Sequence, residues 1–392
     1  MPDPTRRPSA FLPARAGQAQ GLALPEWLPQ DIREMQLLLT GDSVVDWHRL
    51  DMQGPDDVRR LLRVNSIDVD NAEDLRRLAD LRARAVHYLT ENLGLRLDEA
   101  IVSAIPATEL PLHASQRGRL QRQACVLLKV MHIMYHLDAR ELRTLLSIPD
   151  NALFELVEQS IMVLFDELRA SGVPVVEFAW SRKTPDSLVT KLLVKRETSA
   201  ARVFDRLRFR VVVERFEDIL PTLHVMLTRF VPFNYVVPGQ TVNSLVDPAL
   251  LDRRAADPGD TGRVAPTPQE VPNEFSARGY EVLNFVADLP VRVDALLGEQ
   301  DRGSGNVVFV LAEFQVMDRA TAIANEQGES SHAAYKHRQH QRVRERLLRG
   351  PRKAAEGGEN VDDPDPSRSG SRPSADVTDS GALRLRDGKP EG

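Results

Sequence analysis

The segment Ser181-Arg182-Lys183-Thr184-Pro185-Asp186-Ser187 decides the fold of the second half of the chain, because a strand pattern ends before it and a helix pattern begins within it. The apolar run at residues 173–178 predicts a buried strand. Thr184 can cap a helix, and Pro185 suits the first helical position, where its missing N–H costs nothing. We therefore predict a strand, a basic turn and then a helix over residues 184–196.

The predicted helix carries a basic stripe. Ser187, Lys191 and Lys195 recur every four residues and so share one face, and Lys183 lies in the turn before them. Most basic residues of the chain are arginines, yet these lysines gather here. A lysine ammonium is a compact point charge that suits a polyphosphate. A solvated basic helix face explains the stripe equally well, and both interpretations stay open.

A second strand pattern follows at residues 202–214 and carries an acid. Leu207, Phe209 and Val211 alternate with arginines, which is typical of a half-buried strand with Asp205 near its start. A carboxylate there is costly to bury alone, so it needs a cation. That cation is either an arginine, in a structural pair, or Mg²⁺, which in proteins takes one or two carboxylates together with substrate phosphates.

A third strand pattern, residues 307–316, contains another acid within a strongly β-forming run. Glu313 and Gln315 fall on one face of this strand, opposite Phe314 and Val316. A glutamate inside so apolar a strand needs a partner. The pattern therefore predicts a buried acid that is either paired or hydrogen-bonded.

Taken in order, these segments resemble the synthetase domain of the RelA/SpoT family over residues 181–336. Enzymes of that family move pyrophosphate from ATP to the 3′-hydroxyl of GDP or GTP. The matching motifs are Lys183-x-x-x-Ser187-x-x-x-Lys191, Asp205-x-x-x-x-Arg210-Val211, Arg278-Gly279-Tyr280, Glu313-x-Gln315-Val316 and His332-x-x-Tyr335-Lys336. The chain departs from the family pattern at Asn284, where the family has histidine, and at Met317-Asp318, where it has arginine and threonine.

The resemblance implies a role for each matched residue. Asp205 and Glu313 would hold Mg²⁺ on the phosphates of ATP, or Glu313 would accept the proton of the acceptor hydroxyl. Tyr280 would stack on guanine, although packing on the sheet explains a tyrosine there equally well. The other expected nucleotide contacts are Arg182 on adenine, Lys183, Ser187, Lys191 and Arg210 on phosphates, and Gln315, His332 and Lys336 at the remaining motif positions.

The pattern predicts an α+β protein with an N-terminal all-helical domain followed by a nucleotidyltransferase-like domain with a mixed sheet. Its predicted parts are a flexible lead at 1–29, the helical domain at 30–171, the second domain at 172–349 with a loop insertion at 239–277, and a disordered tail at 350–392.

The helical domain contains no adjacent His-Asp pair of the kind that marks the hydrolase domain of the family. His132 and His136 are spaced by four residues, but two histidines without a third ligand are weak evidence for a metal, and we interpret them as core or surface residues. We expect this domain to serve regulation or packing.

Composition narrows the class of protein. The 392 residues carry a net charge of −6 and one cysteine, Cys125, so a disulfide framework is excluded. No apolar run approaches the length of a membrane span, and we expect a cytoplasmic protein. The basic run after Lys336 is either a solvated helix face or a path for RNA.

Two functions remain open from the sequence. The first is a Mg²⁺-dependent pyrophosphokinase that uses ATP and a GDP, GTP or related 3′-hydroxyl acceptor. The second is a nucleotide- or RNA-binding regulator that has kept the fold and lost the reaction, which Asn284 and Met317-Asp318 favour. The residues that favour the enzyme are Lys183, Asp205, Arg210 and Glu313. The pattern specifies neither the acceptor nor the number of copies that assemble.

Overall fold

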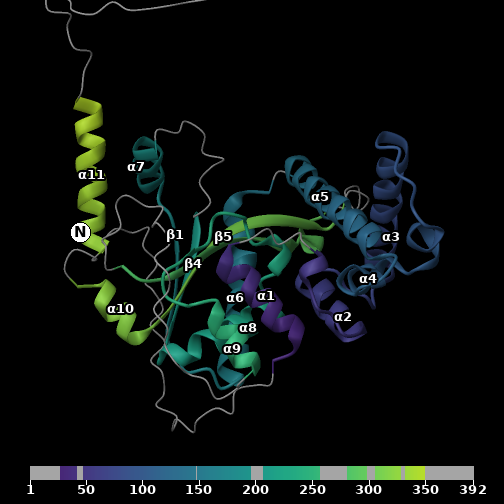
Figure 1. Cartoon of the computed structure of the whole chain (residues 1–392). Helices are drawn as coiled ribbons and strands as arrows, with labels where there is room; N and C mark the ends of the chain where they lie inside the picture. The colour runs from purple at the N-terminus through teal and green to yellow at the C-terminus, as the bar shows by residue number, and fades with distance from the viewer. Residues whose placement is uncertain are drawn as a thin grey trace, which may run out of the picture. The chain divides into compact units, whose positions relative to one another are not determined.

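The computed structural model describes residues 27–41, 47–146, 148–195, 206–256, 280–297, 305–327 and 332–348. The described residues up to Leu347 belong to one compact unit, to which the following description applies. This unit is an α+β fold in which helices pack on a mixed five-stranded sheet (Figure 1). The predicted fold class is confirmed at this level, while the predicted domain boundary at residues 171–172 stays a prediction.

The sheet has the strand order β1-β2-β5-β4-β3. Strands β2 and β5 are parallel, and every other neighbouring pair is antiparallel. The bounds are β1 Val175–Arg182, β2 Leu207–Val213, β3 Val242–Asn243, β4 Leu283–Arg292 and β5 Val307–Asp318.

The helices before the sheet are α1 Pro29–Thr40, α2 Pro55–Val64, α3 Ala72–His87, α4 Leu110–Ser115, α5 Gln121–Leu145 and α6 Asp150–Ala170. Those within and after it are α7 Pro185–Lys195, α8 Ile219–Arg229, α9 Ala249–Ala256, α10 Arg319–Asn325 and α11 His332–Leu348. Among the helices described, none combines the length and apolarity that crossing a bilayer requires.

A row of phenylalanine rings forms the centre of one sheet face. Phe178, Phe209, Phe314 and Phe285 come from β1, β2, β5 and β4, and neighbouring ring centroids lie 6.4, 5.4 and 5.1 Å apart. Helices α6 and α8 contact this side of the sheet, where the ring of Phe165 on α6 lies 5.0 Å from that of Phe178. Burial of these large rings is a major source of stability.

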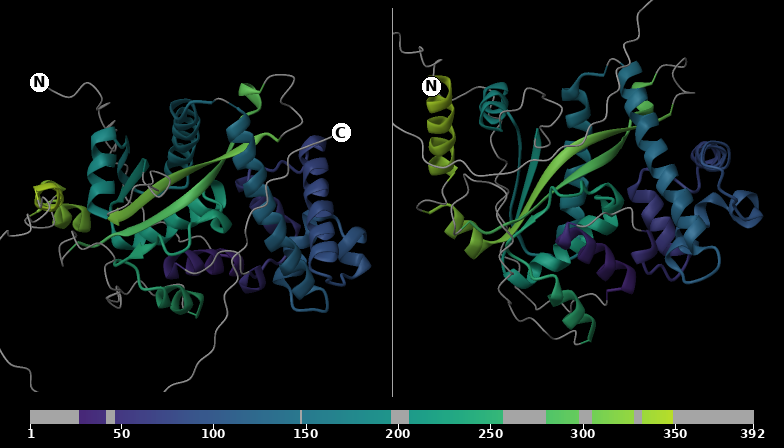
Figure 2. Two further views of the ribbon diagram at one scale, coloured as in Figure 1. Left: turned by 90° about the horizontal axis from the view of Figure 1, so that it is seen from above. Right: turned by 45° about the horizontal axis from the view of Figure 1, so that its top comes forward.

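Helix α5 packs on the opposite face, at one end of the sheet. Strands β4 and β5 form a long pair that reaches α5 (Figure 2). There the ring of His136 lies 4.7 Å from that of Phe309 on β5, and its Nε2 lies 2.6 Å from Oδ2 of Asp288 on β4. The remainder of this face carries the polar side chains of the candidate site.

Two predicted elements differ from the structure. The apolar pattern of residues 233–237 predicts a strand, but Phe233–Tyr235 is a 3₁₀ turn, and Val236 forms an isolated bridge to β4. Pro232 begins this turn, and proline cannot donate to a sheet ladder. The described part of the predicted loop insertion at 239–277 contains β3 and α9, where Leu245, Val246, Leu250 and Leu251 are buried and α9 packs against α1.

A buried polar cluster joins α1 to α2 and α8. Glu34 on α1 is 5% exposed and accepts a hydrogen bond from Gln30 Nε2 at 2.6 Å. The carboxylate of Asp31 forms an ion pair with Arg60 of α2 at 3.0 Å and lies 3.1 Å from Nε2 of His224 of α8. Burial raises the pKa of Glu34 from 4.5 to about 8, so its carboxyl is protonated at neutral pH.

We expect Glu34→Gln to stabilise the protein increasingly as the pH rises. Because the folded pKa lies above the unfolded one, wild-type stability is highest below 4.5 and falls until about pH 8. The slope from one such proton is at most about 1.4 kcal/mol per pH unit. Glutamine keeps the contact with Gln30 and removes the titration. Urea unfolding at pH 5, 6.5 and 8 measures the difference, with exposed Glu141→Gln as the control. A gain that did not grow with pH would contradict this assignment.

Candidate functional site

The sheet face opposite the phenylalanine row gathers polar side chains from neighbouring strands. In the register of the sheet, Arg208 on β2 pairs with Glu313 on β5, and Gln315 on β5 pairs with Asn284 on β4. Because partners across a ladder point to the same side, these side chains meet. We call this group the polar sheet face; its members are Glu177, Arg208, Arg210, Asn284, Glu313 and Gln315.

Glu313 lies at the centre of the polar sheet face, and its side chain is 6% exposed. One carboxylate oxygen accepts from Arg208, with Nε at 3.0 Å and Nη2 at 2.9 Å. The other accepts from Asn284 Nδ2 at 2.8 Å and Gln315 Nε2 at 3.2 Å. A carboxylate offers about four acceptor positions. Glu313 is therefore fully hydrogen-bonded, and Arg208 neutralises its charge.

Arg210 lies two residues further along β2 on the same face. Its Nη2 donates to Glu326, just after α10, at 3.1 Å, and its Nε lies 3.6 Å from the Glu177 carboxylate on β1. The side chain is 26% exposed, so the guanidinium is oriented by acids and still reaches solvent. The phosphate contact expected for Arg210 from the sequence stays a prediction.

The basic turn and α7 begin beside the start of β2. The backbone N–H of Lys183 donates to the Arg206 carbonyl at 2.9 Å. Thr184 Oγ1 accepts from the Ser187 N–H at 3.4 Å and donates to Ser187 Oγ at 3.2 Å, so the predicted helix start is confirmed. Lys183 and Lys191 both have interaction partners. Asp205 lies outside the described residues, two positions before β2 begins.

Arg182 lies on the other side of the sheet from Glu313. It is the last residue of β1 and pairs with Leu207, whose side chain belongs to the core face. Its Nε and Nη2 donate to the carboxylate of Glu158 on α6 at 2.7 and 2.8 Å, and its guanidinium lies 5.6 Å from the Phe154 ring. The structure thus ties Arg182 to α6, and its expected contact with adenine stays a prediction.

The acceptor-side residues come from the start of β4 and from α10 and α11. Tyr280 is partly buried against the core. The next residue, Glu281, exchanges backbone hydrogen bonds with the Asn325 side chain of α10, at 3.1 and 2.6 Å. Lys336 is exposed on α11, while the side chain of His332 lies outside the described residues. Asn325 therefore fixes the backbone next to Tyr280.

One departure from the family pattern has a structural role. Asp318 accepts hydrogen bonds from the Thr321 N–H at 3.1 Å and the Thr321 hydroxyl at 2.7 Å, and it caps α10. Its carboxylate is directed at the helix start, where a negative charge is favourable.

The residues around Glu313 offer few ligands for Mg²⁺. Within the described ranges, no group of three or more His, Cys, Asp or Glu side chains could hold a metal ion. Glu313 supplies one carboxylate, which is compatible with a Mg²⁺ ion bound mainly through substrate phosphates. Such binding requires Arg208 to release the oxygen that it now occupies.

Several solved structures are similar to this chain over half its length. Small alarmone synthetase 2 from Bacillus subtilis is 16% identical, with 50% of this chain and 91% of that chain covered and a TM-score of 0.27. Small alarmone synthetase 1 from Bacillus subtilis, bound to its product pppGpp, is 14% identical, with 51% of this chain and 89% of that chain covered and a TM-score of 0.28. A GTP pyrophosphokinase family protein from Streptococcus pneumoniae is 15% identical, with 50% of this chain and 86% of that chain covered and a TM-score of 0.27.

No family model and no curated protein matches the chain. Because TM-scores of this size carry no functional information, the assignment of a function depends on the side chains described above.

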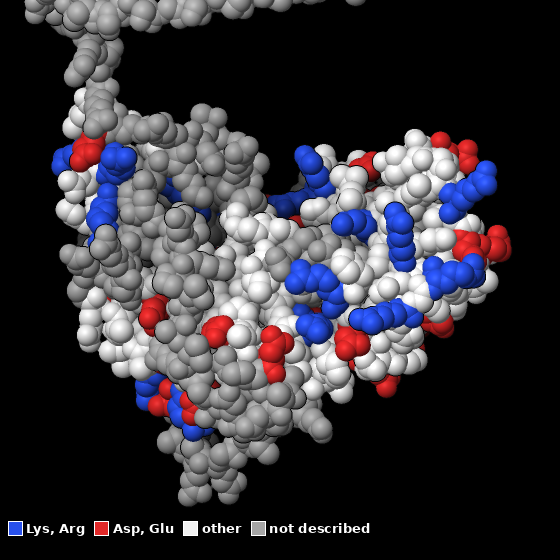
Figure 3. All heavy atoms as spheres, viewed as in Figure 1, with Lys and Arg blue, Asp and Glu red and all other residues white. Residues whose placement is uncertain are grey.

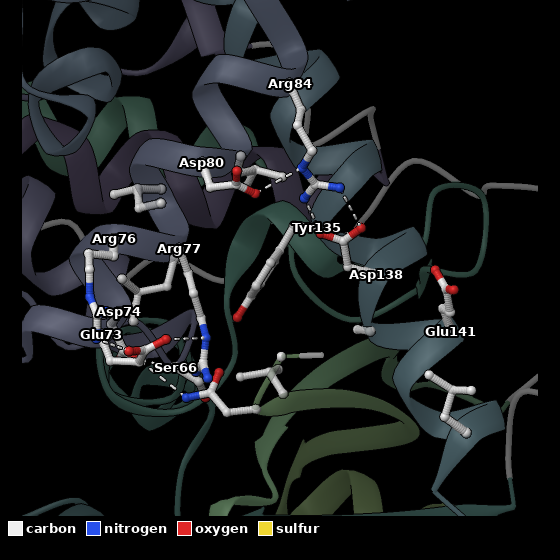
Figure 4. A pocket seen from close by; sticks show the side chains of 18 residues that line it. Ser66, Glu73, Asp74, Arg76, Arg77, Asp80, Arg84, Tyr135, Asp138 and Glu141 are labelled. Carbon is white, nitrogen blue, oxygen red and sulfur yellow. Dashed lines mark hydrogen bonds and ion pairs between the residues drawn. The ribbon is translucent and has the colours of Figure 1, made fainter. Parts of the chain in front are cut away.

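The described residues also line an open pocket that the sequence did not indicate. It has a volume of about 490 Å³ and lies between α3, α5 and the start of β5 (Figure 4). Its charged walls are largely paired: Arg84 contacts Asp80 at 3.1 Å and also Asp138, and Arg77 contacts Glu73 at 3.3 Å. These pairs join residues of different helices or of successive turns, and no motif marks them.

Surface charge bears on the expected RNA partner. Figure 3 shows basic side chains spread over the surface of the helical part, with acidic side chains among them. Helix α11 also carries exposed basic side chains, among them Lys336, Arg342 and Arg344. RNA binding through α11 stays a prediction, as does a cytoplasmic location.

Proposed function

We propose that this chain is a Mg²⁺-dependent pyrophosphokinase-type nucleotidyltransferase. It moves pyrophosphate from ATP to the 3′-hydroxyl of a guanosine nucleotide or of a related acceptor. The observation that supports this proposal is Glu313, a buried carboxylate in mid-sheet, held by Arg208, Asn284 and Gln315 and close to the strand end from which the Lys183 turn departs.

In the proposed reaction the acceptor 3′-oxygen attacks the β-phosphorus of ATP. A new O–P bond forms there, the bond between the β-phosphorus and the bridging α,β-oxygen breaks, and AMP leaves with that oxygen and its electron pair. Lys183, Lys191 and Arg210 stabilise the phosphate charges. Mg²⁺, when bound, would be held by Asp205 and Glu313 and would neutralise the charge that develops on the phosphates.

The acceptor proton needs a base, and Glu313 is the buried carboxylate at the centre of the polar sheet face. Either Glu313 takes this proton or it binds the metal, and both roles require that Arg208 release it. Tyr280 would stack on the acceptor base, in a position that Asn325 stabilises through the neighbouring backbone.

One observation favours a second function, a nucleotide-binding regulator without turnover. Glu313 is saturated by donors, and one of these is Asn284, which replaces the histidine of the family pattern. A permanently engaged Glu313 would leave nucleotide binding intact and prevent catalysis.

The deciding experiment is a transfer assay on the purified protein with Mg²⁺ and γ-labelled ATP. GDP, GTP and bulk tRNA are offered separately as acceptors, and the products are separated by thin-layer chromatography. We expect label to move to one acceptor. Asp205→Ala should abolish transfer, and Asp70→Ala, at a side chain that is 80% exposed, should preserve it. No transfer to any acceptor, together with ATP binding that depends on Lys183, would favour the regulator.

A further inference from the structure

Arg208 occupies a position between the two halves of the proposed site. In the sheet register it pairs with Ser181 of β1 on one side and with Glu313 of β5 on the other. The Lys183 N–H bonds to the carbonyl of Arg206, two residues away on the same segment. The Arg208 guanidinium therefore lies between the basic turn and the buried carboxylate.

The exposures of the two partners differ. The side chain of Arg208 is 29% exposed and that of Glu313 is 6% exposed. The guanidinium can thus turn toward a ligand in solvent, whereas the carboxylate stays in the sheet. A guanidinium forms paired hydrogen bonds with phosphate as readily as with carboxylate.

Release of Arg208 would not leave Glu313 without partners. Oε1 would keep its hydrogen bonds from Asn284 and Gln315, and only Oε2, which Arg208 now occupies, would become available. A triphosphate carries several negative charges, so it competes well for the guanidinium against one carboxylate. The exchange therefore leaves Glu313 with two of its hydrogen bonds, and Oε2 takes a new partner from the proposed reaction, either the metal ion or the acceptor hydroxyl.

We propose that Arg208 is a substrate-operated switch: it neutralises Glu313 in the free protein and transfers to the phosphate chain of a nucleoside triphosphate when that ligand binds. The exchange couples triphosphate binding to exposure of a reactive carboxylate oxygen. Arg208 is then a phosphate ligand and a positioning residue that the motif comparison missed. This inference rests on the proposed function, since it places the triphosphate beside the Lys183 turn.

A double-mutant cycle on the full chain tests the switch without relying on turnover. The proteins are wild type, Arg208→Gln, Glu313→Gln and the double variant, unfolded in urea with and without Mg²⁺ and the α,β-methylene analogue of ATP. In the free protein we expect the two residues to be coupled by about tenfold in the unfolding equilibrium constant. Saturating nucleotide should remove most of that coupling. Coupling that persists unchanged in the complex would overturn the switch.

Nucleotide affinity provides the second measurement, with matched arginine variants. Arg208→Gln should weaken binding of the analogue by about tenfold or more, as expected for a charged hydrogen bond. Arg208→Lys should recover part of it, and it serves as the folded variant if the glutamine protein is unstable. Arg319→Gln, which breaks the exposed Arg319–Glu214 pair at 3.0 Å, is the control.

The outcomes separate the two proposals. Wild-type protein that neither transfers label nor binds the analogue overturns both the function and the switch. If the wild-type protein and Arg208→Gln bind the analogue equally tightly, that result overturns the switch alone. A pH–rate profile that shifts in Arg208→Gln and not in Arg319→Gln supports it, because only the first substitution removes the positive charge next to the reacting carboxylate.

Discussion

Replacing Glu313 by glutamine is expected to reduce pyrophosphate transfer by about 10²–10⁴-fold, the range typical of a lost general base. Glutamine has nearly the same shape but carries no charge and accepts no proton at neutral pH. Initial rates with γ-labelled ATP at saturating acceptor measure the effect. The loss should appear in kcat, while the affinity for ATP changes little or rises, because Arg208 no longer has an anionic partner to leave.

Glu214→Gln is the matched control for this substitution. Glu214 pairs with Arg319 at 3.0 Å and its side chain is 44% exposed. Its substitution therefore removes one negative charge, as Glu313→Gln does, but at an exposed position outside the polar sheet face. Rates within twofold of wild type are expected. If Glu313→Gln behaved like this control, neither the base role nor the metal role of Glu313 could stand.

Substituting Phe314 by alanine is expected to cause the largest loss of stability, about 3–5 kcal/mol. Its side chain is fully buried at the middle of the sheet, with the rings of Phe209 and Phe285 at 5.4 and 5.1 Å on either side. Alanine there removes the contacts of both neighbours and leaves a cavity between β5 and α8. Urea unfolding monitored by circular dichroism measures the loss.

Two companion variants define the cause of that loss. Phe314→Leu should cost less than the alanine variant because it fills part of the cavity. Ile323→Ala on α10, at a side chain that is 52% exposed, should change stability by less than about 0.5 kcal/mol. A Phe314→Ala loss as small as that of Ile323→Ala would show that the ring row does not carry the core.

Features of the site that depend on residues close together in the chain could be predicted from the sequence. The cap of α7 follows from Thr184 and Pro185, and the shared face of Glu313 and Gln315 follows from the period of two along a strand. Both predictions are confirmed. The mistaken strand at residues 233–237 shows the limit of this reasoning, because an apolar segment next to proline can also form a turn.

The partners of the charged groups could not be predicted, because they depend on the register between distant strands. Arg208 and Glu313 are separated by 105 residues, and only the parallel pairing of β2 with β5 brings them together. The pattern of β2 identified its arginines without indicating which one meets the acid. Asn284 was interpreted as a sign of lost function from its position in the motif, and its contact with Glu313 could not be predicted.

The strand order also governs when the site can exist during synthesis. Strand β2 lies between β1, which precedes it closely, and β5, which is encoded about a hundred residues later. Until β5 has left the ribosome, one edge of β2 has no partner, and such an edge invites pairing with other chains. Arg208 and Arg210 lie on that strand, and charged side chains discourage this kind of aggregation. The same arginines can therefore protect the nascent chain before they serve the finished site.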